Sequence, residues 1–150
     1  MLFWDDLKVG ETCDLGTAQV TREEVIAFAE RYDPQPFHLD DNAAAMTHFG
    51  KISASGWHTC AMVMRVIVDS FTERQLVSVG SPGVDNLRWL KPVFPGDTLA
   101  VTSETLELTP SRSKPGLGSA RSRIEAVNQD GVKVLSMETI LLVLKRTSAD

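Results

Sequence analysis

A carboxylate and an imidazole lie close together in the segment 32–38, which has the sequence Tyr-Asp-Pro-Gln-Pro-Phe-His. An aspartate ordinarily titrates at about pH 3.9 and a histidine at about pH 6.5, so Asp33 and His38 combine a charged acceptor with a group that exchanges protons near neutrality. Pro34 and Pro36 stiffen the backbone between them, so both side chains could reach one small substrate or one water molecule. By spacing alone, a simple chain reversal at Asp33 is the favoured explanation, because Asp and Pro are common turn residues.

The segment 53–58, Ser-Ala-Ser-Gly-Trp-His, is a second candidate site at the expected start of a long helix. The first N–H groups of a helix have no partner within it, and together with the helix dipole they suit an anion such as an enolate oxygen. Gly56 also permits close approach of its backbone to a ligand. Taken alone, the segment is more simply explained by Ser53 or Ser55 capping the helix. We expect His58, in the first helical turn, to line the site.

Metal, nucleotide and serine-hydrolase sites have little support. His38, His48 and His58 are evenly spaced but lack a tight pair such as H-x-x-x-H, so we expect no metal site. Four basic residues could meet the phosphates of a nucleotide-bearing substrate, although scattered basic residues are usually only solvated: Arg88, Lys91, Arg112 and Lys114. Patterns for dinucleotide, nucleoside-triphosphate and serine-hydrolase sites are absent from the sequence.

Helices in the first half of the chain should position these residues. Residues 21–24, Thr-Arg-Glu-Glu, have the spacing of a capping box, which predicts a helix that begins after the threonine. Pro34 disfavours helical geometry at Asp33, so that helix should end there. A short alanine-rich helix, capped by Asp40 or Asp41, should follow up to about residue 48.

A longer helix is expected from about Gly56 to Phe71. Its apolar residues recur at i, i+3 and i+4 spacing and predict one buried face, formed by Trp57, Cys60, Ala61, Met64, Ile67, Val68 and Phe71. Val63 and Val66 widen this face until most of the helix should be buried. Arg65 and Asp69 are spaced to pair on the remaining side.

The second half of the chain predicts antiparallel strands at 84–90, 98–108, 120–127 and 132–144. A turn at 92–97, a polar loop at 110–118 and a hairpin at Asp130-Gly131 separate them. We expect the last strand to be buried on both faces over its middle. Helices followed by strands indicate an α+β fold, and one apolar helix beside a single sheet requires the sheet to curl around it.

The composition indicates an ordinary globular protein. At 150 residues, with 43% hydrophobic and 23% charged residues, we expect one domain spanning 1–150. The net charge of −5 gives no long-range attraction to nucleic acid or anionic membrane. Cys13 and Cys60 suggest no disulfide framework, and neither a secretory signal nor a membrane-spanning run is present, so a cytoplasmic location is expected.

Three ordered motifs resemble the MaoC-like dehydratases, which include the R-specific enoyl-CoA hydratases. They lie at residues 32–40, at 49–50 with 52–59, and at 84–97. The resemblance implies the hot-dog fold, in which a curved antiparallel sheet wraps a long central helix. It also implies an acyl-CoA thioester as the substrate and a homodimer or higher homo-oligomer, with the site near the subunit interface.

The resemblance also assigns roles to single residues. Asp33 and His38 correspond to the catalytic pair, and Gly56 lies where a backbone N–H polarises the thioester carbonyl. Substrate-binding residues are then expected at Gln35, Ser55, Trp57, His58 and Arg88. Two positions depart from the family pattern: Gln35 replaces the usual Asn, and Met64 stands where well-known enoyl-CoA hydratases have a serine.

The resulting expectation is reversible hydration of a trans-2-enoyl thioester to an (R)-3-hydroxyacyl thioester. Asp33 and His38 would hold the water, without a metal or redox cofactor and with CoA as part of the substrate. A hot-dog thioesterase and a non-catalytic acyl-CoA-binding module are the alternatives. The sequence does not predict the length or branching of the acyl chain, the choice between CoA and a carrier protein, or the pathway.

Overall fold

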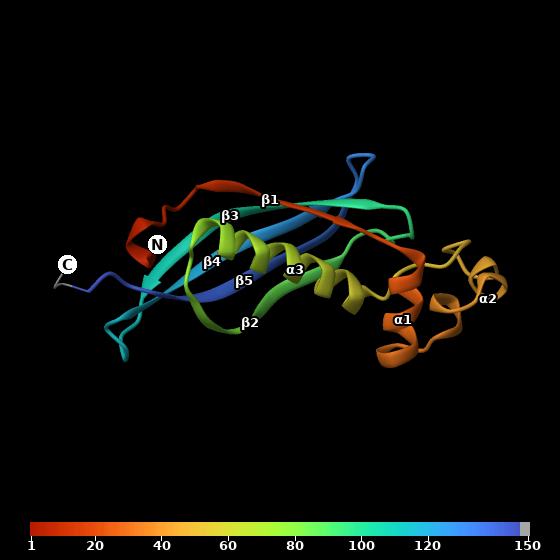
Figure 1. Ribbon diagram of the computed structural model, residues 1–150, viewed down its shortest axis with the longest axis horizontal. Coiled ribbons are helices and arrows are strands. Elements are labelled where there is room, and N and C mark those ends of the chain that lie inside the picture. The colour runs from red at the N-terminus through yellow and green to blue at the C-terminus, as the bar shows by residue number, and fades with distance from the viewer. Residues whose placement is uncertain (148–150) are drawn as a thin grey trace.

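A long helix, α3 (Gly56–Arg74), lies along one face of a five-stranded antiparallel sheet in the computed structural model, which describes residues 1–147 (Figure 1). In spatial order the strands are β1 (Thr12–Gln19), β3 (Thr98–Pro110), β4 (Leu117–Val127), β5 (Lys133–Leu144) and β2 (Ser78–Trp89). This is the α+β hot-dog arrangement predicted from the sequence.

The core lies between α3 and the concave face of the sheet. Val63 of α3 is fully buried, as are Leu99 and Val101 of β3 and Leu135 of β5. Burying an aliphatic side chain of this size stabilises the fold by about 1.5–3 kcal/mol. Replacing Leu135 with alanine would therefore cost about 2–5 kcal/mol, including the cavity that it leaves.

The predicted buried face of α3 is only partly confirmed: Val63, Val66 and Ile67 are buried, but the rest of the buried side is displaced around the helix. Trp57, Met64 and Val68 are 60%, 44% and 45% exposed. The full buried side of α3 carries His58, Thr59, Met62, Val63, Val66, Ile67 and Ser70. Because the helix is apolar on almost all sides, its periodicity does not determine which side packs against β1 and the rest of the sheet. The expected ion pair is present, with Arg65 Nε 2.9 Å from Asp69 Oδ1.

Two helices precede α3 and lie beyond one end of the sheet (Figure 1). Helix α1 (Arg22–Tyr32) begins as predicted, because the Thr21 hydroxyl accepts a hydrogen bond from the Glu24 N–H at 3.3 Å. It ends at Asp33, also as predicted. Helix α2 (Asp41–Ala45) is capped by Asp40 and is shorter than expected. Short 3-10 turns, η1 (Trp4–Asp6) and η2 (Pro36–His38), complete the helical segments.

The strands differ from the prediction mainly at their ends. Strand β1 was not predicted, and β2 begins at Ser78 rather than near residue 84. In β5, full burial on both faces occurs at Val134 and Leu135, near the start of the strand, and the middle is only partly buried. The hairpin at Asp130-Gly131 is present. No helix within residues 1–147 is long and apolar enough to cross a membrane.

Candidate active site

A cleft of about 800 Å³ opens where α1 and η2 meet the start of α3 and the end of β2. Asp33, His38 and Ser55 lie on its polar side. The other side is largely apolar and includes Phe37, Phe49, Trp57, Trp89, Val93, Phe94 and Val134. Residues of all three sequence motifs therefore converge on one concave surface, to which the third motif contributes Trp89, Val93 and Phe94.

Asp33 and His38 face each other in this cleft. Asp33 is the C-cap of α1, and His38 ends the 3-10 turn that follows. The His38 Nε2 atom lies 3.4 Å from Asp33 Oδ2, and the two side chains are 7% and 20% exposed respectively. The Pro34–Pro36 backbone thus folds the two groups toward one point.

The second ring nitrogen of His38 determines where its proton lies. His38 Nδ1 is 2.6 Å from the backbone oxygen of Ser53, which can only accept a hydrogen bond. Nδ1 therefore carries the proton, and in a neutral imidazole Nε2 presents a lone pair toward Asp33. A carboxylate and an unprotonated ring nitrogen both accept hydrogen bonds, so one water molecule lying beside the pair can donate one hydrogen to each.

Two neighbours keep Asp33 ionised. The Ser55 hydroxyl is the main cause that holds the pKa of Asp33 below its usual value, followed by the Gln35 amide, while burial opposes them. Gln35 Nε2 donates to Asp33 Oδ1 at 2.7 Å, so the longer side chain at this position still reaches the carboxylate directly. The Ser55 hydroxyl attracts the carboxylate electrostatically, although its geometry falls short of a hydrogen bond.

The start of α3 borders the cleft beside this pair. The N–H groups of Gly56, Trp57 and His58 find no acceptor among the described residues, as expected for a first helical turn. A Cβ atom on Gly56 would lie 2.5 Å from Cε2 of Trp89, so only glycine fits beneath that indole. The helix start is therefore both unpaired and closely covered by an aromatic ring.

Two of the expected substrate-binding residues lie outside the cleft lining. The buried His58 ring stacks on Phe28, with centroids 4.8 Å apart, and its Nδ1 atom has no partner among residues 1–147. Burial lowers the pKa of His58, and Glu24 opposes this effect. Arg88 is exposed on β2, where it donates to the backbone oxygen of Leu87. His58 and Arg88 therefore belong to the sequence motifs, but their side chains do not line the cleft.

Other cleft residues were not singled out from the sequence. Trp89 and Phe94 belong to the third motif, which indicated a family but not an aromatic wall. Ser53 contributes its backbone oxygen, a role that no side-chain pattern reveals. Of the basic residues considered, Lys91 lines the cleft, while Arg112 and Lys114 lie in the connection between β3 and β4.

Among residues 1–147, no three His, Cys, Asp or Glu side chains gather closely enough to hold a metal ion. His48 packs instead against Phe49, with ring centroids 4.1 Å apart. What the site offers is a carboxylate, an imidazole and free backbone donors, which together can move protons and stabilise a developing negative charge.

The known proteins that this chain resembles include dehydratases and a hydratase. A 3-hydroxybutyryl-CoA dehydratase of Methylorubrum extorquens is 30% identical, covering 100% of this chain and 89% of the relative. A crystal structure of the MaoC-like dehydratase from Rhodospirillum rubrum superimposes with a TM-score of 0.87 at 38% identity, covering 98% of this chain and 99% of that one. For the R-hydratase PhaJ1 from Pseudomonas aeruginosa, the TM-score is 0.73 at 26% identity, with coverage of 96% and 86%.

The family model of the MaoC like domain matches residues 7–127. This range includes the Asp33–His38 pair, the start of α3, and strands β1 to β4. The match spans most of the chain, and the chain therefore belongs to the MaoC-like domain family.

Proposed function

We propose that this protein catalyses the reversible syn hydration of a trans-2-enoyl thioester to an (R)-3-hydroxyacyl thioester. The observation that carries the proposal is the convergence of Asp33 and His38 Nε2, 3.4 Å apart, beside the unpaired start of α3. The relatives named as a 3-hydroxybutyryl-CoA dehydratase and an R-hydratase support the same class of reaction.

One water molecule supplies everything that the reaction adds. Held between Asp33 and His38, it loses one proton to one member of the pair while its oxygen forms a bond to C3 of the substrate. Neither the Asp33 carboxylate nor the His38 Nε2 lone pair starts with a proton to give, so the proton taken from the water is the one delivered to C2, directly or after transfer to the other member. A hydrogen and a hydroxyl are thus added, and the pair ends with the proton count it began with. The two groups exchange protons as a coupled unit.

The substrate develops negative charge on its thioester oxygen as the bond to C3 forms. The Gly56 N–H, at the positive end of the α3 dipole, is the proposed donor to this oxygen. A preorganised donor of this kind lowers the barrier by about 2.7–4 kcal/mol. Water addition balances without an electron transfer, so the proposal assigns the protein no redox cofactor and no metal.

The proposed substrate is an acyl-CoA. The apolar wall of the cleft accepts the acyl part, and basic groups near the cleft suit the phosphates of CoA. Lys91 lines the cleft, and Lys51 Nζ lies 4.4 Å from the centroid of the Phe94 ring. The proposal includes no nucleic-acid or membrane partner.

The protein is proposed to act as a homodimer or higher homo-oligomer. Strand β2 is the terminal strand of the sheet, so its outer edge is available to pair with another strand. Val84 on this strand is 50% exposed and lines the same apolar cavity as the exposed Trp57 and Met64 of α3. An edge strand beside exposed apolar side chains favours association with a second copy. Sedimentation should show an oligomer that Val84→Lys dissociates.

The test of the proposed activity is a panel of enoyl-CoAs of different length and branching. We expect loss of enoyl absorbance and formation of a 3-hydroxyacyl-CoA, and a reduction in kcat of about 100- to 10,000-fold for Asp33→Asn and His38→Ala. The matched control is Asp69→Asn, since Asp69 is exposed on the outer side of α3.

Product analysis separates the proposal from its alternatives. Release of free CoA with loss of the thioester would indicate a thioesterase. If no thioester in the panel is converted and both site variants bind acyl-CoA like the wild type, the hydratase proposal fails in favour of a binding module.

A further inference from the structure

Strand β2 is bulged at three places against its partner β5, and the bulge nearest the cleft adds one residue between Asp85 and Arg88. Asp85 pairs with Glu138, but Arg88 pairs with Ser136, so three steps along β2 match two steps along β5. Asn86 lies within this bulge and has a φ of +53°, in the left-handed region. Among non-glycine residues, asparagine is one of the few that adopt this conformation readily.

The bulge reverses the direction of the side chains that follow it. In a regular strand, residues 85 and 89 would lie on the same face, because side chains alternate with a period of two. Here Trp89 pairs with Leu135, whose side chain is fully buried in the core. Paired residues of antiparallel strands point to the same face, so the bulge turns the half-exposed Trp89 to the α3 face of the sheet, away from the face of Asp85.

Once turned inward, Trp89 contacts the start of α3. Its indole covers Gly56 so closely that a Cβ atom there would lie 2.5–2.8 Å from three indole atoms. It also packs edge-on against Trp57, with ring centroids 5.1 Å apart and an interplanar angle of 81°. The position of Trp89 therefore fixes both a wall of the cleft and the backbone around the proposed thioester donor.

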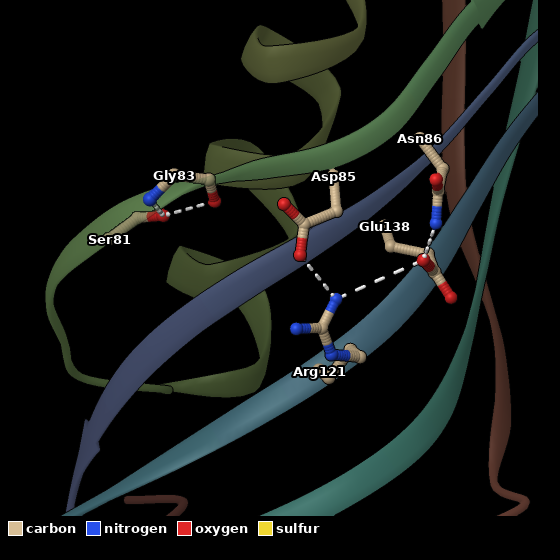
Figure 2. A network of polar contacts seen from close by, with 6 residues as sticks. All are labelled: Ser81, Gly83, Asp85, Asn86, Arg121 and Glu138. Carbon is tan, nitrogen blue, oxygen red and sulfur yellow. Dashed lines mark hydrogen bonds and ion pairs between the residues drawn. The ribbon is translucent and has the colours of Figure 1, made fainter.

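A polar network holds the bulge on the other face of the sheet (Figure 2). The Asn86 amide donates to the Glu138 carboxylate across the strand pair. Arg121 of β4 lies 2.7 Å from Asp85 Oδ2 and 3.8 Å from Glu138 Oε2. Figure 2 shows Arg121 between the two carboxylates, with Asn86 on the far side of Glu138. These contacts join β2, β4 and β5 at the bulge, where the side chains of β2 change face.

We propose that Asn86 is a positioning residue of the thioester site: its left-handed bulge, held by Glu138, aims Trp89 at Gly56. The role of Gly56 in this inference rests on the proposed function. Asn86 itself touches no reacting atom and acts through Trp89. A substitution on the outer face of the sheet can thereby change the geometry of the thioester site on the other face.

The test compares residues that can and cannot adopt the left-handed conformation. Asn86→Val disfavours it strongly, whereas Asn86→Gly retains it without the amide. We expect Asn86→Val to lower kcat/KM by about 10- to 100-fold, since a displacement of about 1 Å near the reacting groups has effects of this order. Asn86→Gly should restore most of the activity.

Gln75→Val is the matched control. Gln75, the C-cap of α3, is the other non-glycine residue with positive φ among those described, and it lies away from the cleft. This variant should lose similar stability but keep its kcat/KM. Sedimentation of each variant checks that the oligomer is intact, because β2 is an edge strand.

Near-UV circular dichroism follows the packing of Trp89 without any substrate. The band that Trp89→Phe removes should also disappear in Asn86→Val and persist in Asn86→Gly and Gln75→Val. Three results for Asn86→Val would each overturn the inference. It could lose activity but keep the band, lose the band but keep its activity, or lose no more activity than Gln75→Val. If the wild type converts no thioester, the proposed function fails, and the band still decides whether Asn86 positions Trp89.

Discussion

The Gly56→Ala substitution tests the arrangement at the start of α3 most directly. The added Cβ would lie 2.5 Å from Cε2, 2.7 Å from Cδ2 and 2.8 Å from Nε1 of Trp89. Since carbon atoms pack at about 3.5 Å, either the indole or the helix start must move by about 1 Å. Overpacking of this kind costs about 1–3 kcal/mol of stability. The better helix propensity of alanine offsets about 0.5–1 kcal/mol of this.

The effect on catalysis should be larger than the effect on stability. A donor displaced by about 1 Å loses its alignment with the thioester oxygen, which corresponds to about a 100-fold reduction in kcat/KM. The measurements are urea unfolding for stability and the initial rate of enoyl-CoA hydration for activity. The substitution itself changes no side chain of the Asp33–His38 pair or of the edge strand β2.

The chain provides a matched control in Gly118 of β4. A Cβ atom there would lie 2.5 Å from Cε2 of Trp4, which reproduces the clash between glycine and indole away from the cleft. Trp4 is held in place by a hydrogen bond from its Nε1 to the Ser119 backbone oxygen at 2.9 Å. Gly118→Ala should therefore destabilise the protein without changing kcat/KM. Equal activities for Gly56→Ala and Gly118→Ala would refute the assignment of a catalytic donor at Gly56.

Three further results are expected. Gln35→Ala removes an amide that lowers the pKa of Asp33, so the limb of the pH–rate profile that reports ionisation of Asp33 should move to higher pH, and an unshifted limb would contradict this assignment. Because burial lowers the pKa of His58 below 6.5, its contribution to stability is complete above that pH and is lost as the pH falls through the lower folded value. His58→Phe, which can keep the stacking on Phe28, should flatten urea-measured stability over that acidic range; an unchanged slope would count against the buried imidazole. Trp57 lines both the cleft and an apolar cavity of about 390 Å³ between α3 and the sheet, so a long acyl chain can extend from the cleft into this cavity, which Met64 also lines. Met64→Ala should therefore raise kcat/KM for long-chain relative to short-chain enoyl-CoAs by about 10-fold, and an unchanged ratio would place the end of the acyl chain elsewhere.

Local chemistry accounts for what the sequence predicted well. The start of α1 depends on a threonine and a backbone N–H three residues apart, and its end depends on Pro34. Asp33 and His38 are close in the chain, so a short stiffened turn suffices to bring them together. In contrast, β1 was missed because it pairs with β3, far away in the sequence, and has a bulge between Asp14 and Gly16.

The remaining errors concern the direction in which side chains point. Helix α3 is apolar on nearly every side, so only packing against the sheet decides that Val63 is buried and Met64 exposed. Arg88 was expected to bind substrate, but the bulge that turns Trp89 inward places Arg88 on the outer face. A single left-handed residue in an edge strand leaves no trace in hydrophobic periodicity.

The segment 53–56 explains how groups from different elements keep a fixed geometry. The backbone oxygen of Ser53 orients His38, the hydroxyl of Ser55 lowers the pKa of Asp33, and the N–H of Gly56 is free. Ser53 and Ser55 are almost completely buried, and the intervening residue donates its N–H to the backbone oxygen of Val93 at 2.8 Å. The water-holding pair and the proposed thioester donor are therefore aligned by four consecutive residues, so a shift of this segment would disturb proton transfer and charge stabilisation together.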